Sequence, residues 1–113
     1  QVNSERSDGS FQAGPGGLPA FARGALSAPK GRLIICLPAT AKKGSASRIV
    51  PSLGNRSMCT LPRYLADTIV TEHGVAEIKN LSTDARAEAL IKIAAPEYQQ
   101  TLLNAWVEMR GQL

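Results

Sequence analysis

Aromatic residues and long apolar runs are both scarce in this chain of 113 residues. It has two Phe, two Tyr and one Trp, so the core is predicted to consist mainly of Ile, Leu, Val and Ala. Such a core suits a sheet covered by helices better than a small module centred on aromatic rings. The longest apolar run, residues 33–37, is far too short to cross a bilayer, and we expect no membrane association. The length allows a single domain.

Histidine and cysteine are scarce as well. His73 is the only histidine, and no second ligand is spaced to join it, so no metal site is predicted. Cys36 and Cys59 have neither zinc-ligand spacing nor the density of a disulfide scaffold. We expect two reduced thiols in a cytoplasmic protein, with Cys36 as a small core residue, and a disulfide is the alternative. The chain begins with Gln and carries no signal sequence, so we interpret its start as cut or processed.

Positive charge is concentrated in the first half of the chain. Residues 1–56 hold eight Lys or Arg and two acidic residues, a net charge of +6, whereas residues 57–113 hold five and seven, a net charge of −2. The basic half is also rich in glycine, so a phosphorylated ligand there is electrostatically reasonable. The basic residues are scattered and lack interleaved aromatic side chains for base stacking, so we expect no nucleic-acid partner.

Strand-like and helix-like segments alternate along the chain and predict an α/β fold with an open, mostly parallel sheet flanked by helices. Residues 1–17 are polar and glycine-rich and are predicted to form a loop. Residues 32–37 are apolar without alternation, which is typical of a strand buried on both faces. Residues 42–47 then form a loop at the end of that strand, where ligands collect in open α/β sheets. Further strands are predicted at 48–50, 67–71 and 75–78.

Helices are predicted from their capping residues. Residues 18–25 form a short helix with Pro19 in its first turn and Phe21 on its buried side. Thr60 caps a second short helix that ends near Ala66, and Ser82 caps a third that runs to Ala94. The last helix begins at Pro96 and ends at Gly111. One face of this helix is interpreted as core, and its members are Tyr98, Leu102, Ala105, Trp106 and Met109. Across the whole chain, the larger side chains expected to be mostly buried are Leu33, Ile35, Leu37, Ile69, Val70, Leu90, Ile93, Leu102 and Trp106.

The most informative motif is Gly14-Pro15-Gly16-Gly17, which continues to Phe21. Backbone N–H groups that no Cβ shields can bond a phosphate, carbonyl or thioester oxygen. The motif is not a dinucleotide fingerprint, because the third glycine position holds Pro19 and no strand precedes it. It is not a phosphate P-loop either, because no Gly-Lys-Ser/Thr follows at the required spacing. A plain turn is the alternative interpretation. We expect the glycine loop, Lys42 and Lys43 to be exposed together at one edge of the sheet.

Several further blocks occur in order with this glycine loop and together suggest a family. They are Gln1 to Glu5, Arg23-Gly24-Ala25, Leu37 to Lys42, Ser47 to Pro51, Thr71 to Ala76, Arg86 to Ile91 and Ile93 to Pro96. The pattern covers nearly the whole chain and resembles the C-terminal domain of the acetyl-CoA hydrolase/transferase family. That family includes 4-hydroxybutyrate, acetate and succinate CoA-transferases.

The resemblance implies covalent chemistry on coenzyme A (CoA). Members move CoA between an acyl-CoA and a carboxylic acid through a glutamyl-CoA thioester. Gly17 matches the glycine of the family that contacts CoA, Gly14 and Gly16 shape the loop, and the amides of Gly16 and Gly17 support the oxyanion. Lys42 matches a lysine used for CoA, whose cation suits a phosphate. Residues 1–113 then form the C-terminal CoA-transferase domain of a two-domain enzyme, without a permanently bound cofactor.

The same resemblance implies partners and a missing nucleophile. The nucleophilic glutamate of the family lies upstream of the segment that Gln1 matches, so this chain is expected to be inactive alone and to work with an upstream N-terminal domain. A homo-oligomer is expected. An acyl-CoA hydrolase of the same family and a noncatalytic α/β binding domain are the alternative functions. Leu18 and Ala20 occupy positions where the family commonly has Gln and Asp, and the acyl substrate is therefore not inherited from better-matching members.

Three other polar residues have structural and functional interpretations. Glu72 and His73 are neighbours that could exchange protons, but we favour a structural role in a turn, because adjacency alone guarantees no geometry. Arg48 is interpreted as a residue that binds a carbonyl or forms a structural ion pair rather than a clamp on the substrate.

Overall fold

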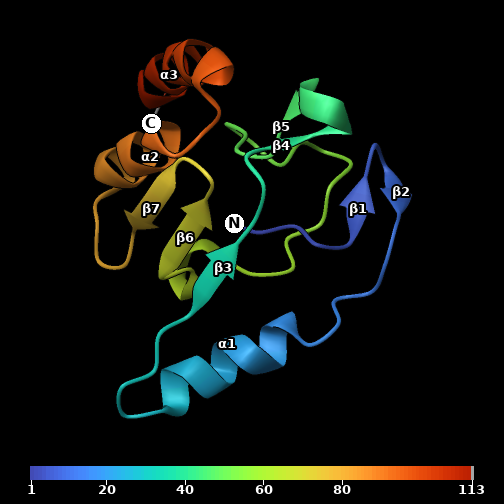
Figure 1. The fold of residues 1–113 in the computed structure, drawn as a ribbon, viewed down its shortest axis with the longest axis vertical. Helices are drawn as coiled ribbons and strands as arrows, with labels where there is room; N and C mark the ends of the chain where they lie inside the picture. The colour runs from blue at the N-terminus through green and yellow to red at the C-terminus, as the bar shows by residue number, and fades with distance from the viewer. Residues whose placement is uncertain (113) are drawn as a thin grey trace. The chain divides into compact units, whose positions relative to one another are not determined.

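The structure of the protein is a computed structural model that describes residues 1–112. Two compact units are present (Figure 1): unit 1 comprises Gln1–Ile34 and Ser52–Asp67, and unit 2 comprises Ile35–Pro51 and the residues from Thr68 onward. Each unit is therefore built from two separate stretches of chain. The candidate site residues are divided between them.

Unit 1 begins with a small hairpin where the sequence predicts only a loop. Strands β1 (Arg6–Ser7) and β2 (Ser10–Phe11) pair antiparallel through a two-residue turn. The turn residues Asp8 and Gly9 have φ angles of 51° and 80°, and Asp-Gly is a favoured pair for such turns. The prediction of a loop over residues 1–17 was wrong here, because it overlooked the Asp-Gly signal.

Helix α1 (Leu18–Ser27) confirms the predicted helix, with Pro19 in its first turn. The expected buried position of Phe21 is wrong, because 76% of this side chain is exposed and Ala22 is instead fully buried. One residue further along the helix rotates the side chain by about 100°, so Ala22 and not Phe21 faces inward. The predicted helix capped by Thr60 is replaced by a short turn, η2 (Arg63–Leu65), and the Thr60 hydroxyl instead donates to Glu5 Oε2 at 2.7 Å.

A three-stranded sheet, which lies in unit 2 apart from Ile34, has the order β3–β6–β7 with bounds Ile34–Cys36, Thr68–Thr71 and Gly74–Glu77. The expected open, mostly parallel sheet is not confirmed. Strands β6 and β7 are antiparallel, since only the two residues Glu72 and His73 connect them, and a parallel pair needs a much longer crossover. Their register places Ile69 opposite Ala76, and both are buried.

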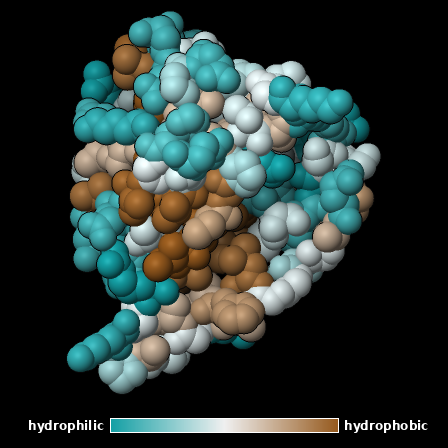
Figure 2. All heavy atoms as spheres, in the orientation of Figure 1, coloured by the Kyte–Doolittle hydropathy of each residue, from teal (hydrophilic) through white to brown (hydrophobic). Residues whose placement is uncertain are grey.

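Strand β3 was predicted to be buried on both faces, and this prediction was wrong. Ile34 is 54% exposed, and Cys36, which we expected in the core, is exposed too. The strand lies at an edge of the sheet, where fewer neighbours cover its side chains. In Figure 2, apolar side chains gather over the part of the view that β3, β6 and β7 occupy in Figure 1.

A second hairpin in unit 2 replaces the predicted strand at residues 48–50. Strands β4 (Thr40–Ala41) and β5 (Ala46–Ser47) pair antiparallel and enclose the short turn η1 (Lys42–Gly44). The N–H of Arg48 donates to the Ala39 carbonyl, and the chain then bends away. Pairing therefore ends before Pro51, which has no N–H to offer a neighbouring strand.

The last two helices confirm their predicted caps. The Ser82 hydroxyl accepts a bond from the Ala85 N–H at the start of α2 (Thr83–Lys92), which ends two residues before the predicted Ala94. Helix α3 (Pro96–Arg110) ends at Gly111. On its predicted core face Leu102 is buried, but Met109 is 37% exposed, because it lies near the end of the helix. No helix within residues 1–112 is long and apolar enough to span a bilayer.

Within residues 1–112, the buried hydrophobic side chains are Ala, Leu and Ile, which agrees with the core that the scarcity of aromatic residues predicts. Six alanines are buried: Ala22, Ala39, Ala66, Ala76, Ala94 and Ala95. Of the larger side chains expected inside, Leu33, Ile69, Ile93 and Leu102 are buried, and Ile35, Leu37, Val70, Leu90 and Trp106 are partly buried.

We expect Thr71→Val to destabilise the protein by about 1–3 kcal/mol, because it removes a buried hydrogen bond and leaves its partners unsatisfied. The Thr71 hydroxyl donates to the Ile93 carbonyl at 2.6 Å and accepts from the His73 N–H at 3.1 Å. Urea unfolding monitored by circular dichroism measures the loss. Thr101→Val, at an exposed position of α3, is the control and should change stability by less than about 0.5 kcal/mol. Equal stability of the two variants would contradict this role.

Candidate functional site

The glycine loop lies in unit 1, between β2 and the start of α1 (Figure 1). Gly14, Gly16 and Gly17 are all exposed, as predicted. Gly16 has φ of 59°, a left-handed conformation that favours glycine. Gly17 is the N-cap of α1, and its carbonyl accepts the N–H of Phe21 at 2.9 Å. The loop therefore leads directly into a helix N-terminus, where backbone amides without intrahelical partners favour an anion.

The space around the loop differs from one glycine to the next. A Cβ added to Gly14 or Gly16 would meet no atom within 4 Å, whereas one added to Gly17 would lie 3.3 Å from the Phe21 ring. A side chain at Gly17 would therefore press on Phe21 and cover the amides at the start of α1.

An open groove of about 770 Å³ runs beside α1 within unit 1. Most of its lining is apolar, and Arg32 adds one cation; the other members are Leu18, Ala20, Phe21, Gly24, Ala25, Leu33 and Ile34. Leu18 and Ala20, the two residues that depart from the Gln and Asp of the family pattern, both line this groove. Their apolar side chains favour an apolar group where the family pattern favours a polar one.

Lys42 lies in unit 2, at the tip of the β4–β5 hairpin, and is exposed as predicted. The φ angles of Lys42, Lys43 and Gly44 are 51°, 56° and 90°, so three successive residues are left-handed. This conformation costs a non-glycine residue about 1–2 kcal/mol. The Ser45 hydroxyl donates to the Lys42 carbonyl at 2.8 Å and helps to close the turn.

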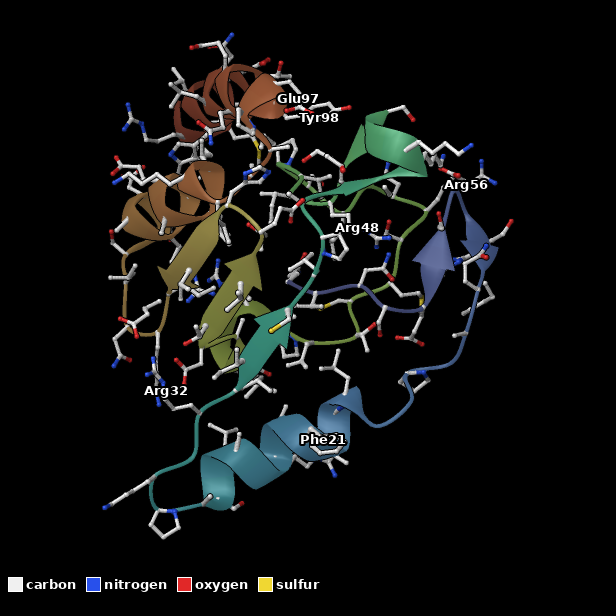
Figure 3. All side chains as sticks on the ribbon, in the orientation of Figure 1. Phe21, Arg32, Arg48, Arg56, Glu97 and Tyr98 are labelled. Atoms are coloured by element: carbon white, nitrogen blue, oxygen red, sulfur yellow. The ribbon has the colours of Figure 1, made fainter. Side chains whose placement is uncertain are left out.

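Three side chains of unit 2 bind the backbone at or next to this hairpin. Arg48 directly follows β5, whereas Glu72 and Tyr98 are distant in the sequence. The Tyr98 hydroxyl donates to the Gly44 carbonyl at 2.7 Å, and Figure 3 shows Tyr98 in the first turn of α3 beside the hairpin. Arg48 Nε donates to the Thr40 carbonyl at 3.2 Å, which confirms its expected role as a carbonyl-binding residue. Glu72 Oε2 accepts the N–H of Ala39 at 2.8 Å, just before β4.

The geometry of Glu72 and His73 favours the structural interpretation of this pair. The bond from the Ala39 N–H is the main reason that the pKa of Glu72 lies below its ordinary value, and its own N–H and the nearby His73 lower the pKa further. His73 Nε2 lies 3.8 Å from Glu72 Oε1, too far for a hydrogen bond. A carboxylate with a lowered pKa is a weak general base, so its contact with the backbone is its clearest role.

The predicted site residues thus fall into two groups. Gly14, Gly16 and Gly17 belong to unit 1 and Lys42 to unit 2, so their proximity stays a prediction. Tyr98 was interpreted from sequence only as a core residue, and no sequence signal marked its bond to the hairpin. Among residues 1–112, no group of three His, Cys, Asp or Glu side chains could hold a metal ion, and both cysteines are free and exposed.

An exposed glycine loop at a helix N-terminus and an exposed lysine on a braced hairpin can each attract an anionic group. The family follows from comparison with known proteins. The model of the acetyl-CoA hydrolase/transferase C-terminal domain matches residues 1–106, and the chain belongs to this family.

Relatives with assigned names agree with this membership. The chain is 44% identical over 92 residues to the 4-hydroxybutyrate coenzyme A transferase of Clostridium kluyveri, covering 81% of this chain and 21% of that protein. It is 42% identical over 107 residues to the butyryl-CoA:acetate CoA-transferase of Anaerostipes caccae, covering 92% and 24%. The chain therefore spans between a fifth and a quarter of the length of these relatives.

Solved structures give the same result for the fold. A crystal structure of RipA from Yersinia pestis matches with a TM-score of 0.77 and 37% identity over 89% of this chain and 23% of that one. A crystal structure of 4-hydroxybutyrate CoA-transferase from Porphyromonas gingivalis matches with a TM-score of 0.71 and 38% identity over 86% and 23%. Over residues 1–112, the small α/β domain with three α-helices and mixed sheets matches CoA-transferase structures.

Proposed function

We propose that this chain is the CoA-binding, C-terminal domain of a CoA-transferase that exchanges CoA between an acyl-CoA and a small carboxylic acid. The observation that carries the proposal is the family match over residues 1–106, supported by relatives named as CoA-transferases. The substrates are the acyl-CoA and the acid, and the partner is an N-terminal domain of the same polypeptide.

In this proposal the reaction proceeds through a glutamyl-CoA thioester. A glutamate outside residues 1–113 attacks the thioester carbonyl and displaces the CoA thiolate, which leaves an acyl-glutamyl anhydride. The thiolate then attacks the glutamyl carbonyl of this anhydride, forms the glutamyl-CoA thioester and releases the acyl group as a carboxylate. The acceptor acid reverses these steps with its own carboxylate. Each attack places negative charge on a carbonyl oxygen, and preorganised backbone amides stabilise such an oxygen strongly. The exposed loop at Gly16 and Gly17 supplies amides of this kind.

The remaining parts of the ligand suit the other features of the chain. Lys42 carries an exposed ammonium group on a hairpin tip, and it is proposed to bind a phosphate of CoA. Gly14 and Gly16 give the loop its shape, Gly16 through its left-handed φ. The groove beside α1, with Leu18 and Ala20 in its lining, suits the apolar part of an acyl group.

The test of this proposal is Lys42→Ala in the intact protein. A charge-assisted bond to phosphate contributes enough free energy that its loss should raise the KM for acyl-CoA about tenfold or more. The dependence of this KM on salt should weaken as well, because salt screens the attraction between charges. Steady-state kinetics at two ionic strengths measure both effects.

Lys30→Ala, which removes an exposed lysine from unit 1, is the matched control and should leave both quantities unchanged. An unchanged KM in Lys42→Ala would refute the phosphate contact. Assays with and without an acceptor acid separate a transferase from a hydrolase, because only a hydrolase releases CoA steadily with water alone.

A further inference from the structure

The tip of the β4–β5 hairpin has a backbone conformation that its own sequence does not favour. Lys42 and Lys43 are both left-handed, although each carries a long side chain, and only Gly44 is suited to its φ of 90°. Such a conformation persists where the surrounding structure determines it. Bonds that reach the tip from elsewhere in unit 2 therefore help to hold this conformation.

Tyr98 binds the tip from a distant part of the sequence. Its hydroxyl donates to the Gly44 carbonyl at 2.7 Å across 54 positions of sequence, and the contact is partly buried. Tyr98 lies in the first turn of α3, which Leu102 anchors in the core with only 7% of its surface exposed. A short bond from a side chain on an anchored helix restrains the Gly44–Ser45 peptide, which follows the two left-handed lysines, more firmly than water could. Figure 3 shows Tyr98 where α3 faces this hairpin.

We infer that Tyr98 is a positioning residue for Lys42, an inference that rests on the proposed contact between Lys42 and CoA. The bond to Gly44 holds the tip left-handed and thereby fixes the direction in which Lys42 leaves the backbone. Tyr98 itself need not touch the substrate. Without the bond, the tip would sample right-handed conformations, and binding CoA would have to order it at a cost in affinity.

The first experiment measures acyl-CoA kinetics of the intact protein carrying Tyr98→Phe, which removes the hydroxyl and keeps the ring. We expect the KM for acyl-CoA to rise about threefold to tenfold, the range given by the loss of one hydrogen bond, while kcat changes by less than about twofold. Tyr64→Phe is the matched control, because Tyr64 is 78% exposed in unit 1, and it should leave KM unchanged.

Gly44→Ala provides a second variant that disturbs the tip without touching Tyr98. A Cβ at Gly44 would meet no atom within 4 Å, so the substitution acts only through its φ of 90°. We expect it to raise KM in the same direction as Tyr98→Phe. If Tyr98→Phe failed to fold, Gly44→Ala in the same assays would still test whether the left-handed tip conformation sets the KM, and an unchanged KM would overturn the inference.

Combination with Lys42→Ala separates positioning from a general loss of stability. If Tyr98 acts through Lys42, then Tyr98→Phe or Gly44→Ala should raise KM no further in the Lys42→Ala background, and each alone should weaken the salt dependence of KM. An independent, additive increase would overturn the inference. If Lys42→Ala raises KM but neither Tyr98→Phe nor Gly44→Ala does, the inference is overturned and the proposed function stays intact. No effect of Lys42→Ala would refute the phosphate contact and the inference together.

Discussion

Gly17→Val in the intact protein is expected to reduce CoA transfer about 100-fold or more, which is the size of effect seen when an oxyanion loses a preorganised donor. The reason is local crowding at the start of α1. A Cβ at this position would already lie 3.3 Å from the Phe21 ring, and the two methyl groups of Val would extend into the space where an oxygen must approach the amides. Gly17 has a right-handed backbone with φ of −83°, so the substitution is not excluded by backbone strain.

Initial rates of CoA transfer and calorimetric CoA affinity measure the effect, and thermal unfolding shows whether the variant is folded. Gly111→Val is the matched control, because Gly111 has φ of −66° and an added Cβ would make only ordinary contacts at 3.5 Å or more. It should leave transfer unchanged. Wild-type transfer by a folded Gly17→Val variant would exclude the glycine loop from the site.

The parts of the fold that sequence predicts well are those set by local signals. The hydroxyl of Ser82 caps α2 as its position before the helical pattern indicates, and Pro96 and Gly111 bound α3. The exposure of the glycine loop and of Lys42 was also predicted correctly. Each of these features depends on a few neighbouring residues.

Features that depend on pairing between distant segments were predicted less well. The five apolar residues at 33–37 do not indicate that β3 is an edge strand. Cys36 is exposed because its strand lies at this edge. The turn at Glu72 and His73 is too short for parallel strands, yet the β-branched run before it is equally typical of either arrangement. Phe21 shows a similar limit for a helix, because a shift of one residue decides whether a side chain is buried, as Ala22 is, or exposed, as Phe21 is.

The candidate site shows why family patterns and structure carry different information. The resemblance predicts Gly17 and Lys42 as site residues, but it could not indicate that two successive lysines are left-handed. That conformation depends on bonds such as that of Tyr98, which comes from a helix 54 positions away. Glu72 is similar: its neighbour His73 suggested acid-base chemistry, whereas its carboxylate binds the Ala39 N–H.

The covalent adduct is expected on a glutamate outside residues 1–113, because a lowered pKa and a bond to the backbone make Glu72 a poor nucleophile. Incubation of the intact protein with acyl-CoA, followed by borohydride or hydroxylamine, should trap a glutamyl-CoA thioester that peptide mass spectrometry locates. Glu72→Gln should leave this adduct in place. Glu77→Gln, which changes an exposed residue of β7, is the matched control.

The same chemistry predicts that residues 1–113 expressed alone form no adduct, because covalent catalysis fails without its nucleophile. Their rate of CoA transfer should lie at least about 1000-fold below that of the intact protein. Recombination with the remainder of the polypeptide should restore both, since the loop and the lysine would again meet the glutamate. An adduct that maps to Glu72 or Glu77 in the isolated chain would reverse this assignment. The nucleophile would then lie on the β6–β7 hairpin, and the glycine-loop amides would have to stabilise an oxyanion formed by a glutamate within residues 1–113.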